Sequence, residues 1–250
     1  MTVKNDDQFY FTGHYVILQA GDTRFRVPNE VLTRESQFFA DMFSLPVPAS
    51  EAVEGGSDDK PIVFPQTVRA ESFRSLLKIL YSSGGTVALD KSEWLSVLEL
   101  ATMWYFLERR KTAIGRLTNI LSPVEKIYYG RMQKVAVWLQ QGYTALVERD
   151  ATITNDEALA LTTNSGSEHA LTAFFLLRIR EKKERALRGS GGKGRRMSPF
   201  NTDMEVGQEF GEELRSIREM EGAYGVVEKL VLETPEVLPE VEDEADDRWY

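Results

Sequence analysis

The two histidines are the first residues to consider for chemistry, because histidine is the commonest general acid or base in enzymes. His14 and His169 are the only histidines in the chain. Neither has a serine nucleophile elbow or a metal-ligand partner beside it at standard spacing. We interpret both as surface or capping residues. Asp58 and Asp59 lie in a polar stretch without an apolar pocket that would tune them for acid–base work, so we interpret them as solvated.

A glycine-rich run near residue 190 has some likeness to a phosphate-binding loop. It reads RGSGGKGRR and extends to Arg196. A phosphate-binding loop needs a serine or threonine after the lysine and a glycine at its first position. Here Gly194 follows Lys193, Leu187 stands at the first glycine position, and a helix is expected before the run. We therefore interpret residues 189–200 as a flexible basic linker.

Cysteine is absent, which excludes disulfides, thiolate zinc sites, iron–sulfur ligation and a cysteine nucleophile. No catalytic constellation is left, so the sequence predicts no enzyme, no cofactor and no metal site. The N-terminus lacks the basic start and apolar run of a signal peptide, and the longest compact apolar stretch, Leu171 to Leu177, is too short to span a bilayer. We expect an intracellular protein of the cytoplasm or nucleus, without membrane contact.

Charge is distributed unevenly along the chain. The formal net charge of −9 makes nucleic acid an unfavourable partner. Residues 178–196 nevertheless hold nine Lys/Arg and two Glu, while residues 233–250 hold eight acidic residues and one arginine, so the two segments can attract each other. The basic segment has the composition of a nuclear import signal or a nucleic-acid contact, but a solvated helix end is the favoured interpretation. Its basic patch comprises Lys182, Lys183, Arg185, Lys193, Arg195 and Arg196.

The N-terminal part of the chain shows both strand and helix patterns. Between Tyr15 and Val27 the run TRFRV alternates apolar and basic residues after an Ala-Gly-Asp turn, which predicts a hairpin with one buried face. Asn29 is expected to cap a short helix, and Ser36 is expected to cap a second one that extends to Phe43. The polar stretch from Leu45 to Lys60 is expected to be an exposed loop.

The next elements are a strand and three helices. The sequence predicts a strand at residues 61–64, followed by a helix at residues 71–81. A second helix is expected to begin at the Asp90–Glu93 capping box, and a third is expected at residues 109–121. From Ser122 on, strand patterns disappear, and a second capping box opens a new helix. Tyr128, Met132, Val135 and Leu139 are expected to share one helix face.

The remainder of the chain is expected to be helical as far as its acidic end. Thr154 and Glu157 form another capping box, and residues 167–188 form a long helical candidate. The basic half of that candidate is expected to project into water. A further amphipathic helix is expected within residues 201–232, and residues 233–250 have the composition of a disordered acidic tail.

The order of these elements resembles the BTB/POZ family over residues 10 to 121. Family members typically show a glycine-linked hairpin, a valine–leucine pair, a serine, an aromatic and a Met-Phe pair at the spacing found in VPNEVLTRESQFFADMF. At their helical spacing some residues would be core in any fold, namely Phe39, Met42, Phe43, Leu76 and Leu80. The order and spacing of the whole set therefore carry the resemblance. The continuation WLSVLELATMW with its helical run is similar to fungal BTB proteins. The matching residues are Gly21, Val31, Leu32, Ser36, Phe39, Met42 and Phe43.

Two positions depart from the family pattern, and one loop is also unusual. Many relatives have an aspartate where Tyr15 stands and a histidine where Pro28 stands, and both positions bear on partner binding. The acidic loop after Phe43 falls where cullin-binding relatives place an apolar-x-Glu contact motif. The pairs Val53-Glu54 and Ser50-Glu51 do not reproduce that motif.

The resemblance implies an α+β fold, in which a BTB/POZ-like unit with a small sheet and a helical cluster precedes an all-helical C-terminal extension, residues 122–188. It implies a protein–protein interaction module, a scaffold or adaptor that associates with itself or with another protein. Phe9, Tyr10 and Phe11 are expected interface residues because BTB dimers often involve this region, with intramolecular packing as an equal alternative. The competing hypotheses are a substrate adaptor for a cullin-type ubiquitin ligase and a transcriptional or chromatin regulator.

Overall fold

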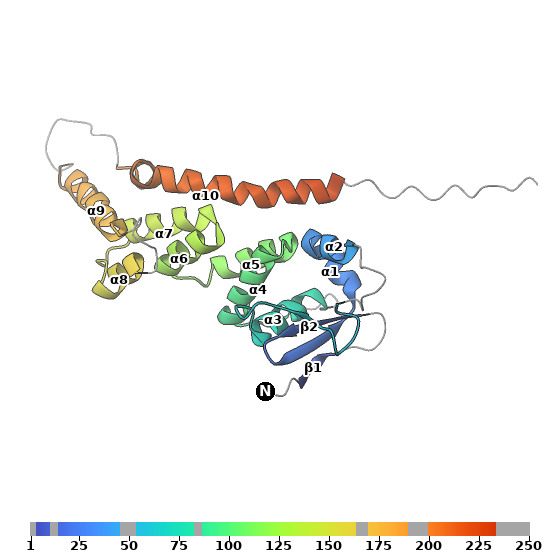
Figure 1. Ribbon diagram of the computed structural model, residues 1–250. Helices are drawn as coiled ribbons and strands as arrows, with labels where there is room; N and C mark the ends of the chain where they lie inside the picture. The colour runs from blue at the N-terminus through green and yellow to red at the C-terminus, as the bar shows by residue number, and fades with distance from the viewer. Residues whose placement is uncertain are drawn as a thin grey trace, which may run out of the picture.

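The computed structural model of the chain describes residues 4–10, 15–45, 54–82, 87–163, 170–189 and 200–233. Figure 1 shows a small sheet with its helices at the N-terminal end, a group of helices beside them, and one long helix that runs across both. The α+β class with a mostly helical C-terminal half is confirmed. The C-terminal residues 234–250 and linker residues 190–199, for which the sequence predicts disorder and flexibility, lie outside the described residues.

The sheet is built around the predicted hairpin. β2 (Val16–Ala20) and β3 (Thr23–Val27) pair antiparallel, and Gly21 between them adopts the left-handed φ of 60° that favours glycine. β4 (Ile62–Val63) pairs parallel with β2. Within the described residues the strand order is β1-β3-β2-β4.

The edge strand β1 (Lys4–Tyr10) was not predicted. Its sequence, KNDDQFY, lacks alternation of apolar and polar residues, yet it pairs parallel with β3. Asp6 explains part of this placement, because its carboxylate is buried and accepts a 2.8 Å hydrogen bond from Nε of Arg74 on the helix behind the sheet. A charge-assisted contact between residues so far apart leaves no local pattern in the sequence.

Part of the expected loop from Leu45 to Lys60 is ordered against the sheet. The backbone N–H of Ile17 donates to the carbonyl of Gly55 at 2.8 Å, and the N–H of Gly55 donates to the carbonyl of Lys60 at 2.6 Å. Gly55 is buried, and a Cβ at this position would lie 2.7 Å from a methyl of Val16. Residues 54–60 are therefore an extension of the sheet edge, whereas residues 46–53 lie outside the described part of the chain.

Five helices complete the N-terminal half. Their positions agree closely with the predicted ones, apart from the first cap: Pro28 is the N-cap of the first helix and provides no side-chain cap, because Asn29 is already its first helical residue. Ser36 caps the second helix as predicted, since its hydroxyl accepts from the N–H of Phe39. The helices are α1 (Asn29–Glu35), α2 (Gln37–Ser44), α3 (Ala70–Leu80), α4 (Lys91–Met103) and α5 (Leu107–Thr118).

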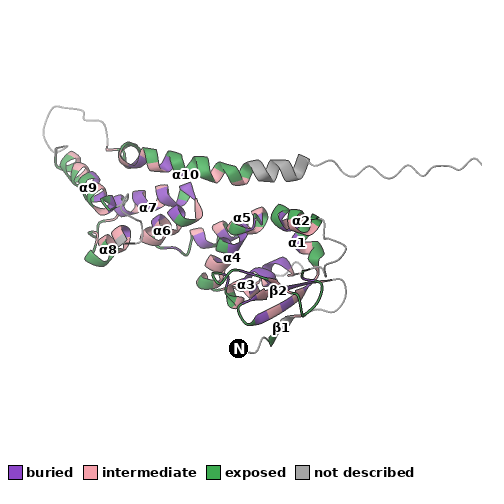
Figure 2. Ribbon diagram, viewed as in Figure 1, coloured by how far each residue is buried: buried purple, intermediate pink, exposed green. Residues whose placement is uncertain are grey.

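Aromatic rings fill the space between the sheet and these helices. Phe73 of α3 makes edge-to-face contacts with Phe25 and Phe64, both at a 5.0 Å centroid distance. Trp104 packs against Phe64 at 4.7 Å and against Phe39 at 5.5 Å. Figure 2 shows these segments buried on their inner faces. Such ring pairs add about 0.5–1.5 kcal/mol each beyond the burial of their area.

The second half is helical, and its first two helices are separated by a break that was not predicted. Tyr128, Met132, Val135 and Leu139 do not share a face: Met132 is 56% exposed, whereas Val135 and Leu139 are fully buried. Lys134 has a φ of 56°, which ends one helix and resets the phase of the next. The helices are α6 (Pro123–Gln133), α7 (Ala136–Glu148), α8 (Asn155–Thr163), α9 (Thr172–Gly189) and α10 (Thr202–Glu233).

Helix α10 packs its apolar stripe against α7 and α9. Val206, Phe210, Leu214 and Ile217 are buried there together with residues of α6 and α7. The ring of Phe210 stacks on that of Tyr143 at a centroid distance of 3.9 Å. Below this region α7 also reaches the first core, where Trp138 and Val135 pack with the residues of the N-terminal half. The two hydrophobic clusters therefore meet along α7.

The basic half of α9 is not simply solvated. Lys182 donates to Glu205 of α10 at 2.6 Å, and Arg178 is paired with Glu209 of the same helix. Within the described part of the basic segment, Arg178 and Lys182 are thus paired with α10. The expected attraction to residues 233–250 concerns a tail that lies, beyond Glu233, outside the described residues.

The α7–α8 connection makes stability sensitive to acid. Arg149 donates two hydrogen bonds to Glu157, at 2.7 and 2.5 Å, and Glu157 also accepts from the N–H of Thr154 in the predicted capping box. The arginine lowers the pKa of Glu157 from 4.5 to about 2. Because the folded-state pKa lies below the unfolded one, this contribution is complete above about pH 4.5 and is lost as the pH falls towards 2.

Replacing Glu157 with glutamine should therefore reduce stability at pH 6 by about 1 kcal/mol and have a much smaller effect near pH 2. Urea unfolding of both proteins across this pH range measures the difference. Glu148→Gln, at an exposed position of α7, is the control and should change stability little at either pH. An effect of Glu157→Gln that is equal at both pH values would contradict the assignment.

Candidate functional site

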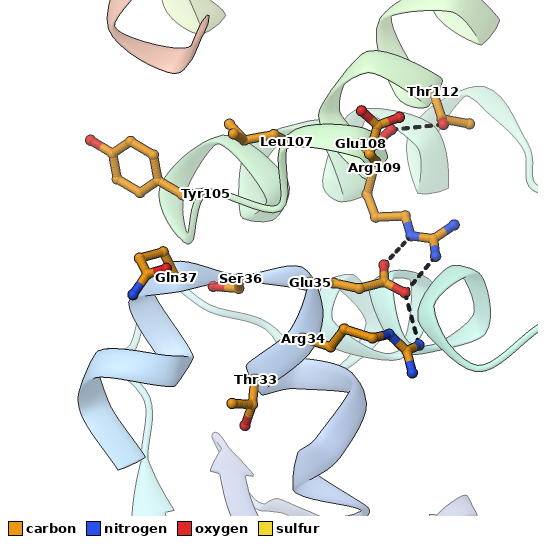
Figure 3. Close-up of a pocket in the computed structure, with 10 residues that line it drawn as sticks. All are labelled: Thr33, Arg34, Glu35, Ser36, Gln37, Tyr105, Leu107, Glu108, Arg109 and Thr112. Atoms are coloured by element: carbon orange, nitrogen blue, oxygen red, sulfur yellow. Dashed lines mark hydrogen bonds and ion pairs between the residues drawn. The ribbon is translucent and has the colours of Figure 1, made fainter. Parts of the chain in front are cut away.

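A cavity of about 400 Å³ opens between the α1–α2 junction and the start of α5 (Figure 3). It lies on the N-terminal half, where two short helices meet the α4–α5 turn. Both polar and apolar side chains line it. They are Thr33, Arg34, Glu35, Ser36, Gln37, Tyr105, Leu107, Glu108, Arg109 and Thr112.

A two-point ion pair crosses one end of the cavity. Arg109 of α5 donates from Nε and Nη2 to the two carboxylate oxygens of Glu35 on α1, at 2.6 and 2.7 Å. The side chains of Glu35 and Arg109 are 16% and 29% exposed, so the pair is only partly screened by solvent. Arg34 reaches the same carboxylate at 3.4 Å but keeps 62% of its side chain exposed. The pair fixes α1 against α5, and the side chain of Arg34 stays largely exposed at the cavity.

On the other side of the cavity, Ser36 connects α2 to the end of α4 through hydrogen bonds. Its buried hydroxyl donates to the carbonyl of Trp104 at 2.6 Å while it accepts from the N–H of Phe39 at 3.3 Å. This single side chain caps α2 and joins it to the end of α4. The family-signature serine therefore holds two walls of the cavity, α2 and the α4–α5 turn, together.

Tyr105 forms the edge of the cavity in an unusual backbone conformation. Its φ is 55°, the left-handed region that is uncommon for residues other than glycine. The N–H of Phe106 donates to the carbonyl of Ala101 at 2.9 Å, which makes this turn a Schellman-type end of α4 with Tyr105 in the left-handed position. Tyr105 is 38% exposed, and Figure 3 shows its ring directed away from the ion pair.

Two large apolar side chains close in sequence to the lining residues are exposed. Phe38, next to the lining residue Gln37, is 42% exposed, and Met103, before the α4–α5 turn, is also 42% exposed. Aromatic residues, methionine and arginine are the types enriched in protein interfaces. A preformed hollow whose neighbouring segments expose such residues is suited to receive a side chain of another protein.

The predicted signature residues lie mainly behind this surface. Leu32 and Phe39 are fully buried, Ser36 is 1% exposed, and Val31, Met42 and Phe43 are partly buried against the same core. Except for Ser36, none of them lines the cavity. They position α1 and α2 rather than offer contacts.

The predicted interface residues are in a different place. Tyr10, at the end of β1, is half-buried, donates a hydrogen bond to Asp58, and lies 5.6 Å from the guanidinium of Arg26. It does not line the cavity. Phe9 is part of β1, its side chain is not described, and Phe11 lies outside the described residues.

The predicted basic patch is not assembled in the described part of the chain. Lys182 pairs with α10, Lys183 donates to the carbonyl of Glu148 at 3.0 Å, and Arg185 pairs with Glu181 one turn away. Lys193, Arg195 and Arg196 lie outside the described residues. Among the residues that are described, there is no cluster of metal ligands. None of the described helices has the length and apolar character needed to cross a membrane.

Sequence reasoning missed the cavity because its walls come from distant positions. Glu35 and Arg109 are 74 residues apart, and neither belongs to a local motif. The exposed Phe38 beside the buried Phe39 was the nearest available signal, since an amphipathic helix seldom needs two consecutive phenylalanines for one core.

Comparison with known proteins places this surface in a family domain. A family model that describes the BTB/POZ domain matches residues 13–113. The matched range runs from before β2 into α5 and includes every residue that lines the cavity. No curated protein matches the chain.

Proposed function

Since residues 13–113 are a BTB/POZ domain, a protein–protein interaction module, we propose that this chain associates with a second copy of itself through the surface around the α1–α2/α5 cavity. Another protein is the alternative partner on the same surface. The observation that carries this proposal is the exposure of Phe38 and Met103, close in sequence to the residues that line a hollow whose walls are fixed by the Glu35–Arg109 pair.

The rigidity of the walls supports a binding role. Association loses free energy whenever loops and side chains must be ordered at the interface, about 0.5–1.5 kcal/mol for each long side chain. Here Ser36 and the ion pair already hold the two helices and the turn in place. A partner therefore meets a surface that is largely organised before contact.

The size of the surface sets what a partner must contribute. A specific interface buries about 1,200–2,000 Å² in total, more than a cavity of this size offers by itself. The cavity can accept one anchoring side chain, while α2, α5 and the α4–α5 turn supply the surrounding contacts. Central aromatic and arginine residues usually carry most of the binding energy in such an arrangement.

Light scattering after size exclusion tests the proposal on the full chain. One copy has a mass of 28.4 kDa, so a dimer has twice this mass, 56.8 kDa. We expect a mass that approaches the dimer value as concentration rises over a hundredfold range. Phe38→Asp should weaken dimerisation at least tenfold, which corresponds to about 1.4 kcal/mol, because it places a charge at the rim of the contact.

The matched control is Phe174→Asp on α9. Phe174 is 56% exposed, more than Phe38, but it belongs to the helical extension. It should leave the dimer unchanged. A chain that stays monomeric at every concentration would refute self-association, and a dimer that resists Phe38→Asp but dissociates with Phe174→Asp would place the interface elsewhere.

A further inference from the structure

We infer that the C-terminal half of α10 regulates the α1–α2/α5 cavity by holding Tyr105 in place. The inference rests on the proposed function for its biological meaning, but the physical link between α10 and Tyr105 is independent of it. The link is a contact between two tyrosine rings: Tyr105 lines the cavity, and its ring lies 5.7 Å from the ring of Tyr224 on α10.

Tyr105 has a backbone conformation that residues other than glycine seldom adopt. A non-glycine residue in the left-handed region is disfavoured, because its Cβ crowds the backbone. Most helices that end in this way have glycine at the left-handed position. The tyrosine side chain must therefore gain contacts that offset this cost. Tyr105 is 38% exposed, and the ring of Tyr224 is the aromatic contact that it has among the described residues.

Tyr224 is held by a second contact, with a buried arginine of α5. Its ring also lies over the guanidinium of Arg110 on α5, at 4.2 Å from the centroid. Arg110 is 6% exposed and donates from Nη2 to the carbonyls of Gln133 and Lys134 at the end of α6, at 2.8 and 3.1 Å. A buried guanidinium with no carboxylate bonded to it among the described residues gains from an aromatic face. Tyr224 thus bridges the buried cation and the cavity edge.

Contacts other than those of Tyr224 fix the position of α10. Glu221, one turn before Tyr224, accepts from the N–H of Ala136 at the start of α7, at 3.1 Å. Further back, α10 is fastened by its buried stripe and by the pairing of Glu213 with Arg131. Loss of the Tyr224 ring therefore should not release the helix. It should release only the contacts that this ring makes with Tyr105 and with the guanidinium of Arg110.

The expected coupling between α10 and the cavity is positive. When α10 is docked, Tyr105 is held in the conformation that forms the cavity edge, so docking of α10 and binding of a partner favour each other. Coupling of this kind is reciprocal: a partner seated in the cavity also stabilises the end of α10. A factor that displaces the end of α10 lowers the affinity of a site on another domain without touching it.

Hydrogen exchange of the full chain tests the link directly. Tyr224→Ala should speed exchange of the Trp104 and Phe106 amides about three- to tenfold, the range expected when one aromatic pair is lost. Tyr224→Phe, which keeps the ring, should exchange as the unmodified protein does. Met220→Ala, at a 40% exposed position of the same helix, is the matched control and should have no effect on these amides.

The second readout is dimerisation of the same variants. Tyr224→Ala should weaken the dimer about three- to tenfold, whereas Tyr224→Phe and Met220→Ala should not. Unchanged exchange at Trp104 and Phe106 in Tyr224→Ala would overturn the inference, whatever the oligomeric state. Faster exchange in a chain that never dimerises would support the link and refute only the proposed self-association. If Tyr224→Ala does not fold, Tyr224→Leu replaces it and is judged by the same two readouts.

Discussion

Replacing Arg131 with methionine is expected to lower the free energy of unfolding by about 3–5 kcal/mol. Arg131 is 7% exposed and connects four helices. It donates to Glu213 on α10 at 2.6 Å, to the hydroxyl of Tyr143 on α7 at 2.9 Å, and to the hydroxyl of Thr172 on α9 at 2.9 Å. Methionine fills the space but removes the guanidinium of Arg131 from beside the carboxylate of Glu213, which is poorly solvated.

The rest of the network explains why the loss should be large. Burial raises the pKa of Tyr143 well above its usual value, so this hydroxyl stays neutral and donates to Glu213 at 2.7 Å. One neutral donor does not replace a guanidinium beside a carboxylate that is only 15% exposed. Urea unfolding followed by circular dichroism measures the loss, with Arg215→Met at an exposed position of α10 as the control.

A double variant separates charge from packing. Arg131→Met combined with Glu213→Leu should recover most of the lost stability, because it removes the carboxylate together with the guanidinium that pairs with it. If the single variant costs less than about 1 kcal/mol, the network does not hold α10 in place. If the double variant is as unstable as the single one, the loss arises from packing.

The second large effect is expected at Phe39. Its side chain is fully buried, and its ring contacts those of Trp104 at 5.5 Å, Phe106 at 5.6 Å and Phe43 at 5.8 Å. Phe39→Ala should reduce the free energy of unfolding by about 3–5 kcal/mol, since it leaves a cavity where α2 meets the α4–α5 turn. The same urea titration measures it.

The neighbouring residue provides the matched control. Phe38 is the same amino acid on the same helix but is 42% exposed, so Phe38→Ala should change stability by less than about 1 kcal/mol. Equal losses in the two variants would mean that α2 is oriented differently. The pair also separates the two roles of this helix, because Phe39 supports the fold and Phe38 is expected to contact the partner.

Local signals in the sequence predicted most of the helices. The capping boxes at Asp90 and Ser122 form as expected, and the one at Thr154 also has both of its hydrogen bonds. Each depends on residues three positions apart, so the necessary information lies within one helical turn. The glycine-linked hairpin and the order of the elements were sufficient to identify the domain, whose match to residues 13–113 agrees with the predicted resemblance.

Contacts between distant residues were not predictable in the same way. β1 is held by Asp6 and Arg74, which are 68 positions apart, and the cavity depends on Glu35 and Arg109. The break at Lys134 is stabilised from outside its own helix by Arg110. In each case a charged residue, which the sequence alone suggests is solvated, makes a hydrogen bond or ion pair with a residue far away in the chain. Hydrophobic periodicity cannot reveal such contacts.

The position of α7 between the two cores has a consequence for synthesis on the ribosome. Trp138 is fully buried in the core of the N-terminal half, and its indole N–H donates to the hydroxyl of Thr118 at 2.8 Å. Chains are made from the N-terminus at about 5–20 residues per second. The BTB/POZ domain cannot complete its core when its own last helix emerges, and must wait until α7 has also left the exit tunnel. During that interval its unfinished surface is open to chaperones.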